Sequence, residues 1–102
     1  MIITVLYKLD AGGKFDLDYY LAKHIPLVRT LCEPVGLNSI RILKGTGTAG
    51  GGAAEFTLIA LLDFGSMTAF EDAMKRHGKE ILGDIPNFTD ANPTIQLNEV
   101  IG

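Results

Sequence analysis

The order of the apolar patterns along the chain most constrains what it can fold into. Strand-like segments rich in β-branched residues alternate with segments whose apolar residues recur at helical spacing. We expect strands at Ile2–Tyr7, Leu37–Lys44, Glu55–Phe64 and Thr94–Val100, and helices from Asp16 to about Cys32 and from Ser66 to about Arg76. This order, β-α-β-β-α-β, predicts an α+β, ferredoxin-like fold with a four-stranded antiparallel sheet and two helices on one face.

Capping residues set the expected ends of the two helices. Asp16 and Ser66 have side chains that accept hydrogen bonds from the first free backbone amides of a helix, so we place both as N-caps. Gly78 is typical of a helix C-terminus. The second helix is therefore expected to end near Arg76, and Glu80–Asp90 is expected to be irregular.

The bulk composition fits one globular domain spanning residues 1–102, because a chain of this length has room for a single core. A formal charge of -3 and scattered Lys and Arg residues argue against nucleic-acid binding. No apolar run approaches the ~20 residues of a membrane span. Cys32 is the only cysteine, which fits a reducing compartment, so we expect a cytoplasmic protein.

The third expected strand is apolar on both faces. Within Phe56–Leu62, every second residue from Phe56 points to one face, and Ile59 and Leu61 point to the other. Two helices can cover only one face of the sheet, and a strand that is apolar on both faces needs cover on both. We therefore expect a homodimer whose sheets pack face to face about a two-fold axis.

His24 lies in the middle of an apolar stripe on the first helix, which consists of Leu17, Leu21, Val28 and Leu31. Pro26 has no backbone N–H for the carbonyl of Ala22, so we expect the helix to kink or open beside His24. A buried imidazole next to a weakened turn indicates a functional site. The alternative is a core histidine that hydrogen-bonds a backbone carbonyl, such as that of Ala22.

Two further side chains are candidates beside His24. Tyr20 precedes it by one helical turn, so its phenol would orient the imidazole or donate to a substrate oxygen; the alternative is an amphipathic tyrosine at the helix border. His77 is explained more simply as a residue at a helix C-terminus. The two histidines lie on different helices without metal-ligand spacing, so we predict no metal site.

The glycine-rich segment Gly45–Gly52 superficially suggests a phosphate-binding loop. Such a loop must open into a helix N-terminus, whereas a strand is expected to follow here. We interpret the segment as a mobile connection between two strands and predict no nucleotide cofactor.

Two segments of the chain resemble the EthD family of the dimeric α/β-barrel superfamily. The run Phe15–Val28 contains Tyr-x-x-x-His-x-Pro-Leu, and the run His77–Asp90 contains Gly-Asp-Ile-Pro-Asn-Phe-Thr. The resemblance covers nearly the whole chain as a single EthD-like domain. It implies the fold and the homodimer that the strand pattern predicts, and a pocket between helices and sheet into which His24 points.

The resemblance implies less about chemistry. The family takes its name from a gene cluster for ethyl tert-butyl ether degradation, fungal relatives are associated with dehydration or decarboxylation of aromatic polyketides, and the superfamily includes cofactor-free enzymes. We expect a small cofactor-independent enzyme acting on a hydrophobic, oxygen-bearing small molecule, an aromatic, polyketide-like compound or an ether-degradation intermediate. His24 would be its general acid or base and Tyr20 its partner. The alternative is a non-catalytic small-molecule-binding or accessory protein of a degradation pathway. The substrate-binding residues expected are His77, Asn87, Phe88, Gln96, Leu58 and Met74.

Overall fold

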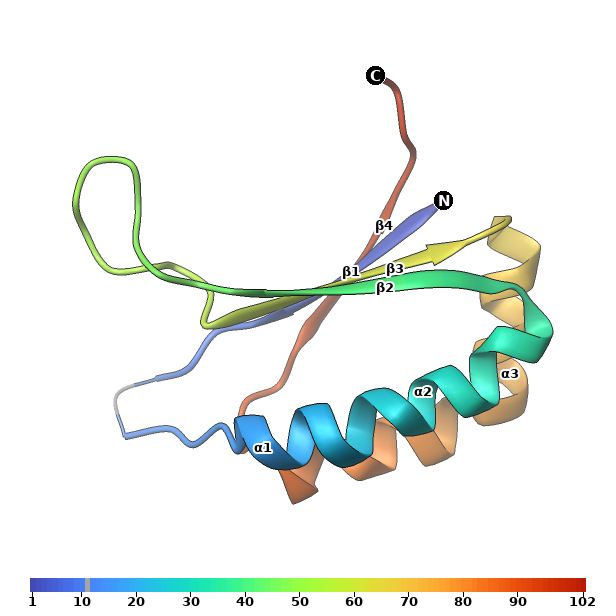
Figure 1. The fold of residues 1–102 in the computed structure, drawn as a ribbon, viewed down its shortest axis with the longest axis horizontal. Coiled ribbons are helices and arrows are strands. Elements are labelled where there is room, and N and C mark those ends of the chain that lie inside the picture. Colours follow the sequence, from blue (N-terminus) through green and yellow to red (C-terminus); the bar gives the residue numbers. More distant parts are fainter. Residues whose placement is uncertain (11) are drawn as a thin grey trace.

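The computed structural model describes residues 1–10 and 12–102, and its elements follow the expected order (Figure 1). The first half contains β1 (Ile2–Tyr7), α1 (Leu17–Tyr19), the π-helical turn η1 (Tyr20–His24), α2 (Ile25–Cys32), the 3-10 turn η2 (Glu33–Val35) and β2 (Leu37–Lys44). The second half contains β3 (Leu58–Phe64), α3 (Met67–Asp84), the 3-10 turn η3 (Ile85–Asn87) and β4 (Thr94–Asn98).

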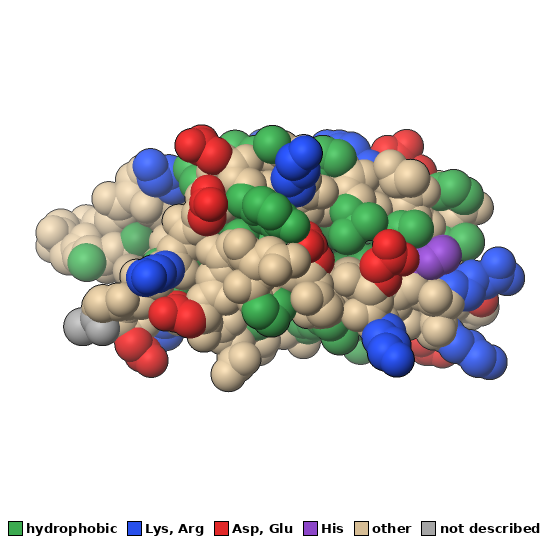
Figure 2. Space-filling view, turned by 90° about the horizontal axis from the view of Figure 1, so that it is seen from below, with side chains coloured by type: hydrophobic (Ala, Val, Ile, Leu, Met, Phe, Trp, Pro, Cys, Tyr) green, Lys and Arg blue, Asp and Glu red, His purple; other side chains and the backbone are tan. Residues whose placement is uncertain are grey.

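The four strands form one antiparallel sheet in the order β2-β3-β1-β4. Figure 1 shows the helical segments on one side of this sheet, with the glycine-rich connection between β2 and β3 extending away from both layers. The predicted α+β, ferredoxin-like arrangement is confirmed. Seen from the helix side, basic and acidic side chains are interspersed among hydrophobic ones (Figure 2). In the described part of the chain, no helix is long and apolar enough to cross a membrane.

The first helix begins as predicted, but its buried side differs from the expected stripe. Asp16 caps the helix, with its Oδ1 accepting from the backbone N–H of Tyr19 at 3.0 Å. At η1 the backbone widens, and the N–H of Ile25 donates to the carbonyl of Tyr20. The expected opening beside His24 is therefore confirmed. The wider turn shifts the register, so Tyr20 is buried at 1% exposure and Leu21, expected in the stripe, is 49% exposed.

Gly36 ends this helical segment and turns the chain into β2. Its φ of +114° lies in the left-handed region, which glycine adopts without steric cost. A Cβ placed on Gly36 would also lie 2.7 Å from the Cβ of Ala69 in α3. The tight approach of the two helical segments at this point therefore requires glycine.

The second helix starts at the Ser66 cap as predicted, with Ser66 Oγ accepting from the Ala69 N–H at 3.1 Å. The prediction of its end is wrong, because α3 continues through a buried Gly78 to Asp84. A glycine within a helix costs roughly 1 kcal/mol of stability. Burial of the apolar side chains of Ile81 and Ile85 against the core outweighs this cost. Residues 80–84 are consequently helical rather than irregular.

Candidate functional site

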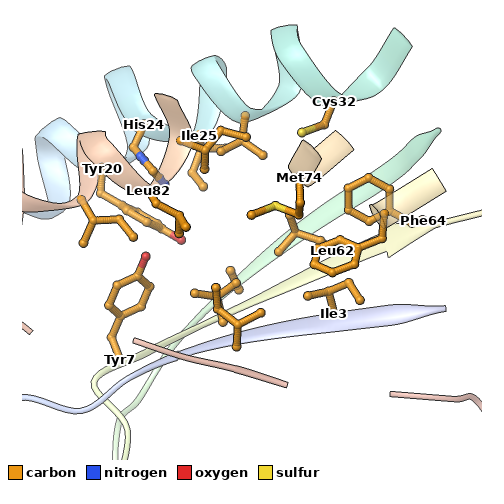
Figure 3. Close-up of a pocket in the computed structure, with 17 residues that line it drawn as sticks. Ile3, Tyr7, Tyr20, His24, Ile25, Cys32, Leu62, Phe64, Met74 and Leu82 are labelled. Atoms are coloured by element: carbon orange, nitrogen blue, oxygen red, sulfur yellow. The ribbon is translucent and has the colours of Figure 1, made fainter. Parts of the chain in front are cut away.

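A cavity of about 60 Å³ lies between the sheet and the helical layer (Figure 3). Strands β1, β3 and β4 line it on one side, and η1, α2, α3 and the first residue of η3 line it on the other. Its wall is apolar apart from Tyr7, Tyr20 and His24 and the thiol of Cys32. Leu82 and Ile95 line the cavity and are 43% and 38% exposed, so they mark its mouth.

His24 is held by a carboxylate from the other helix. Its Nδ1 lies 2.9 Å from Oδ2 of Asp84, and its exposure is 4%. The second oxygen, Asp84 Oδ1, accepts from the Tyr19 hydroxyl at 2.7 Å and from Asn87 Nδ2 at 2.9 Å. Three donors around one carboxylate fix its position, and this carboxylate in turn fixes the imidazole.

The protonation states of the pair follow from these contacts. Burial lowers the pKa of His24, and the hydrogen bond and charge of Asp84 only partly offset this effect. Burial alone would raise the pKa of Asp84, but hydrogen bonds from Asn87, Tyr19 and His24 lower it overall. Near pH 7 the pair is therefore a neutral imidazole beside an ionised carboxylate. Nδ1 carries the proton toward Asp84, which leaves the Nε2 lone pair free.

Aromatic rings fix the plane of the imidazole. The ring of Tyr20 stacks on that of His24 with centroids 5.5 Å apart and planes at 21°. Phe88 contacts the imidazole at a centroid distance of 4.6 Å. In Figure 3 the His24 ring points from its helix toward Tyr20 and Leu82 at the cavity. The histidine thus has a fixed position and is buried.

The two segments that carry the family resemblance meet in space. Phe15 and Thr89 form an antiparallel bridge, and the N–H of Asp16 donates to the carbonyl of Phe88 at 2.7 Å. The Thr89 hydroxyl donates to the Lys14 carbonyl at 2.6 Å. These contacts join the start of the first helix to the end of the second, which brings Asp84 to His24.

The structure brings some of the expected site residues together. His24, Tyr20 and Met74 all line the cavity. Phe88 contacts the His24 ring and Asn87 binds Asp84, so both belong to the surrounding shell rather than to the cavity wall.

Leu58, Gln96 and His77 lie outside the cavity. Leu58 is buried in the core but is not part of the wall. Gln96 pairs with Thr4 on the face of the sheet turned away from the helices, because β4 directs Ile95 to the helix side. His77 lies within α3, so its interpretation as a residue at a helix C-terminus is wrong. The described residues contain no group of three His, Cys, Asp or Glu side chains placed to hold a metal ion.

Two site residues were missed by the sequence analysis. Tyr7 is the last residue of β1 and lies on the same face as Ile3 and Val5. The alternation of side chains along a strand therefore predicts that Tyr7 points toward the helices. Asp84 lies in the second segment that resembles the EthD family. This segment was expected to be irregular, so the orientation of the Asp84 side chain could not be predicted. Its position at the last turn of α3 follows only from the true length of that helix.

Comparisons with known proteins identify similar structures. The chain is similar to the crystal structure of an EthD-like protein from Ralstonia eutropha JMP134, at 33% sequence identity over 99% of this chain and 91% of that chain, with a TM-score of 0.90. It also shares its fold with an EthD family protein from Bacillus halodurans C-125, at 19% identity over 96% of both chains and a TM-score of 0.68. No family profile matches the sequence, and no curated protein does.

Proposed function

This chain belongs to the EthD family, and from that premise and the geometry around His24 we propose that it is a small cofactor-independent enzyme. Its substrate is a hydrophobic, oxygen-bearing small molecule, of the aromatic, polyketide-like or ether-degradation kind. His24 is its general acid–base group, and Asp84 positions that histidine.

The observation that carries the proposal is the hydrogen bond between His24 Nδ1 and Asp84 Oδ2 at 2.9 Å, on a ring that lines an apolar cavity. The carboxylate selects the tautomer in which Nε2 is the free base. Burial lowers the pKa of His24, so the base is unprotonated at neutral pH. A positioned general base of this kind contributes ~10²- to 10⁴-fold to a rate.

The chemistry that this arrangement supports is proton transfer next to a carbonyl. Nε2 of His24 takes a proton from the carbon beside the carbonyl, and the electrons of that C–H bond form a C=C bond. The C=O electrons move to the oxygen, which becomes an enolate. Return of the proton from the imidazolium to carbon or oxygen completes the step without any co-reactant.

The apolar wall favours a second candidate function, a non-catalytic binding or accessory protein that holds such a compound. Among the lining residues, Cys32 is the only thiol, and burial raises its pKa so that it stays protonated. The wall pairs no nucleophile with His24. A carrier of this kind would bind ligand and leave its protons unchanged.

Exchange of carbon-bound protons into D₂O separates the two functions without knowledge of the natural substrate. Cyclopentanone, cyclohexanone and 2-cyclohexenone are incubated with the protein, and loss of the protons beside the carbonyl is followed by NMR. We expect exchange above the buffer rate in the wild type and in His77→Gln, and a fall on the order of 10²-fold or more in His24→Gln. Binding without exchange would indicate the carrier, and equal rates in His24→Gln would exclude His24 as the base.

We also propose that two copies pair through the sheet face turned away from the helices. Cross-strand pairing places Leu43, Ile59 and Leu6 in one row on this face, with Leu61 beside them. The cavity-lining residues of β1 and β3 occupy the other face, which the helices cover. An apolar row at the centre of an uncovered sheet supports a self-complementary contact.

A further inference from the structure

Two buried phenol hydroxyls in the cavity have no role in the His24–Asp84 pair. Tyr7, at the end of β1, and Tyr20, in η1, are each 1% exposed and line the cavity. Figure 3 shows the Tyr7 hydroxyl directed from the sheet toward the helical layer, and the hydroxyl of Tyr20, whose ring contacts that of Tyr7, lies at the same end of the cavity. The hydrogen bonds between described residues include that of the Tyr19 hydroxyl to Asp84 but none of these two hydroxyls. No side-chain oxygen of the described residues that is sealed from solvent lacks a partner, so both hydroxyl oxygens keep accessible surface at the cavity. Buried tyrosine hydroxyls usually have a partner, so this pair has capacity for a ligand.

The two hydroxyls cannot turn away from the cavity, because their rings are locked in an aromatic cluster. The Tyr7 ring packs edge-on against Phe15 at 5.2 Å and against Phe88 at 5.9 Å. The Tyr20 ring contacts the same two residues at 5.2 Å and 5.1 Å. Tyr7 and Tyr20 contact each other at 6.0 Å. The donors are therefore oriented before a ligand arrives.

The chemistry of the wall restricts what the two hydroxyls bind. Burial raises the pKa of both phenols, so at neutral pH they are donors rather than anions. The lining residues include no Lys or Arg that would neutralise a carboxylate or phosphate. A neutral oxygen with two lone pairs on an apolar skeleton fits these donors. The small volume limits the ligand to a compact ring, or to one that extends past Leu82 and Ile95.

We propose that Tyr7 and Tyr20 form an oxygen-binding pair that donates two hydrogen bonds to the carbonyl oxygen of an enolisable cyclic ketone. This inference rests on the proposed function and specifies its substrate class. Because Tyr20 stacks on His24, an oxygen held by Tyr20 places the neighbouring carbon beside the imidazole. When His24 removes a proton from that carbon, the negative charge develops on the oxygen that both hydroxyls contact. The same hydrogen bonds then strengthen as the enolate forms.

A matched pair of ligands tests this proposal by binding alone. Cyclohexanone carries the oxygen, and methylenecyclohexane has the same shape without it. We expect the wild type to bind cyclohexanone at least about tenfold more tightly, because buried donors reject a ligand that leaves them unpaired. In Tyr7→Phe and Tyr20→Phe the preference falls, and in the double variant it disappears. Ser39→Ala, which removes an exposed hydroxyl of β2 outside the wall, keeps the preference.

Equal affinity for the two ligands in the wild type, binding of neither, or a preference that persists in the double variant overturns the proposal. A measurement on the wild type alone does not depend on whether the variants fold. The carbonyl carbon of bound ¹³C-labelled cyclohexanone should resonate at lower field than in an apolar solvent such as cyclohexane, and a resonance at the apolar-solvent position also overturns the proposal. Failure of the proposed function gives a different result, namely oxygen-dependent binding with no proton exchange.

Discussion

Oδ2 of Asp84 lies 2.9 Å from Nδ1 of His24, although the two residues are 60 positions apart and come from opposite helical segments. The same carboxylate accepts hydrogen bonds from Tyr19 and Asn87, and these two bonds hold it in place independently of His24. A histidine buried alone in this apolar cavity would have no preferred tautomer. The pairing makes one nitrogen a donor and leaves the other as a base facing the cavity side.

Replacing Asp84 with asparagine should lower the ketone exchange rate on the order of 10²- to 10⁴-fold, because the base loses its fixed tautomer. Asp84 raises the pKa of His24 against the effect of burial, so its removal lowers that pKa further. The acid limb of the exchange rate against pH should therefore move to lower pH in Asp84→Asn.

Asn87→Ala is the matched control, since it removes a donor to Asp84 and leaves the carboxylate in place. We expect a smaller loss of rate and no comparable displacement of the acid limb. An Asp84→Asn variant that loses rate with an unmoved pH profile would assign Asp84 a structural role only.

Stability should fall on acidification because of His24. Its pKa is lowered in the folded state, so between its usual value of about 6.5 and that lower value the unfolded chain binds more protons. The free energy of unfolding should then decrease by up to about 1.4 kcal/mol per pH unit as pH falls through this window. Asp84, whose pKa is also lowered, adds a similar loss only below its usual range near 4.

Urea unfolding between about pH 8 and pH 5 checks this expectation. The decrease should disappear in His24→Gln and persist in His77→Gln, which removes the other histidine of the chain. An equal dependence on pH in the wild type and in His24→Gln would show that the burial of His24 does not lower its pKa.

Leu61→Asp should separate the proposed dimer, because it places a charge in the apolar face that the partner would cover. Leu21→Asp makes the same change on the exposed outer side of η1 and should leave the assembly intact. Sedimentation equilibrium measures both variants. A wild type that sediments as a monomer would contradict the pairing of the two sheets.

Gly36→Ala should destabilise the fold by ~1–3 kcal/mol, since alanine is strained at a φ of +114° and its Cβ would meet Ala69 at 2.7 Å. Gly50→Ala, in the exposed connection where a Cβ meets nothing within 4 Å, should change stability by less than about 0.5 kcal/mol. Urea unfolding of the two variants compares them directly. Equal stability would mean that the helical layer adjusts freely at Gly36.

Much of the fold follows from local patterns. The strand and helix periods fix the element order, and the side chains of Asp16 and Ser66 fix where the helices start. The missing N–H of Pro26 indicates the opened turn at His24. Burial of Tyr20 in place of Leu21 depends on how far that turn opens, which a regular helical period does not contain.

The site is less accessible from sequence because its key contacts join distant segments. Gly78 is typical of a helix end, but core packing extends α3 beyond it. Asp84 was therefore not expected on a helix, and its position beside His24 could not be predicted. The expectation that Gln96 binds substrate fails for a different reason. Neighbouring residues of a strand point to opposite faces, and Ile95 and Leu97 point to the helix side, so Gln96 points away from the cavity. Tyr7 was visible by the same alternation along β1.

The protonation state of His24 is the most direct test of the account, and ¹⁵N NMR of the imidazole measures it. Near pH 7 we predict a neutral ring with the proton on Nδ1, which donates to Asp84, and an unprotonated Nε2. In Asp84→Asn this single tautomer should give way to a mixture. A proton on Nε2 or an imidazolium at neutral pH in the wild type would contradict the assignment of His24 as a general base.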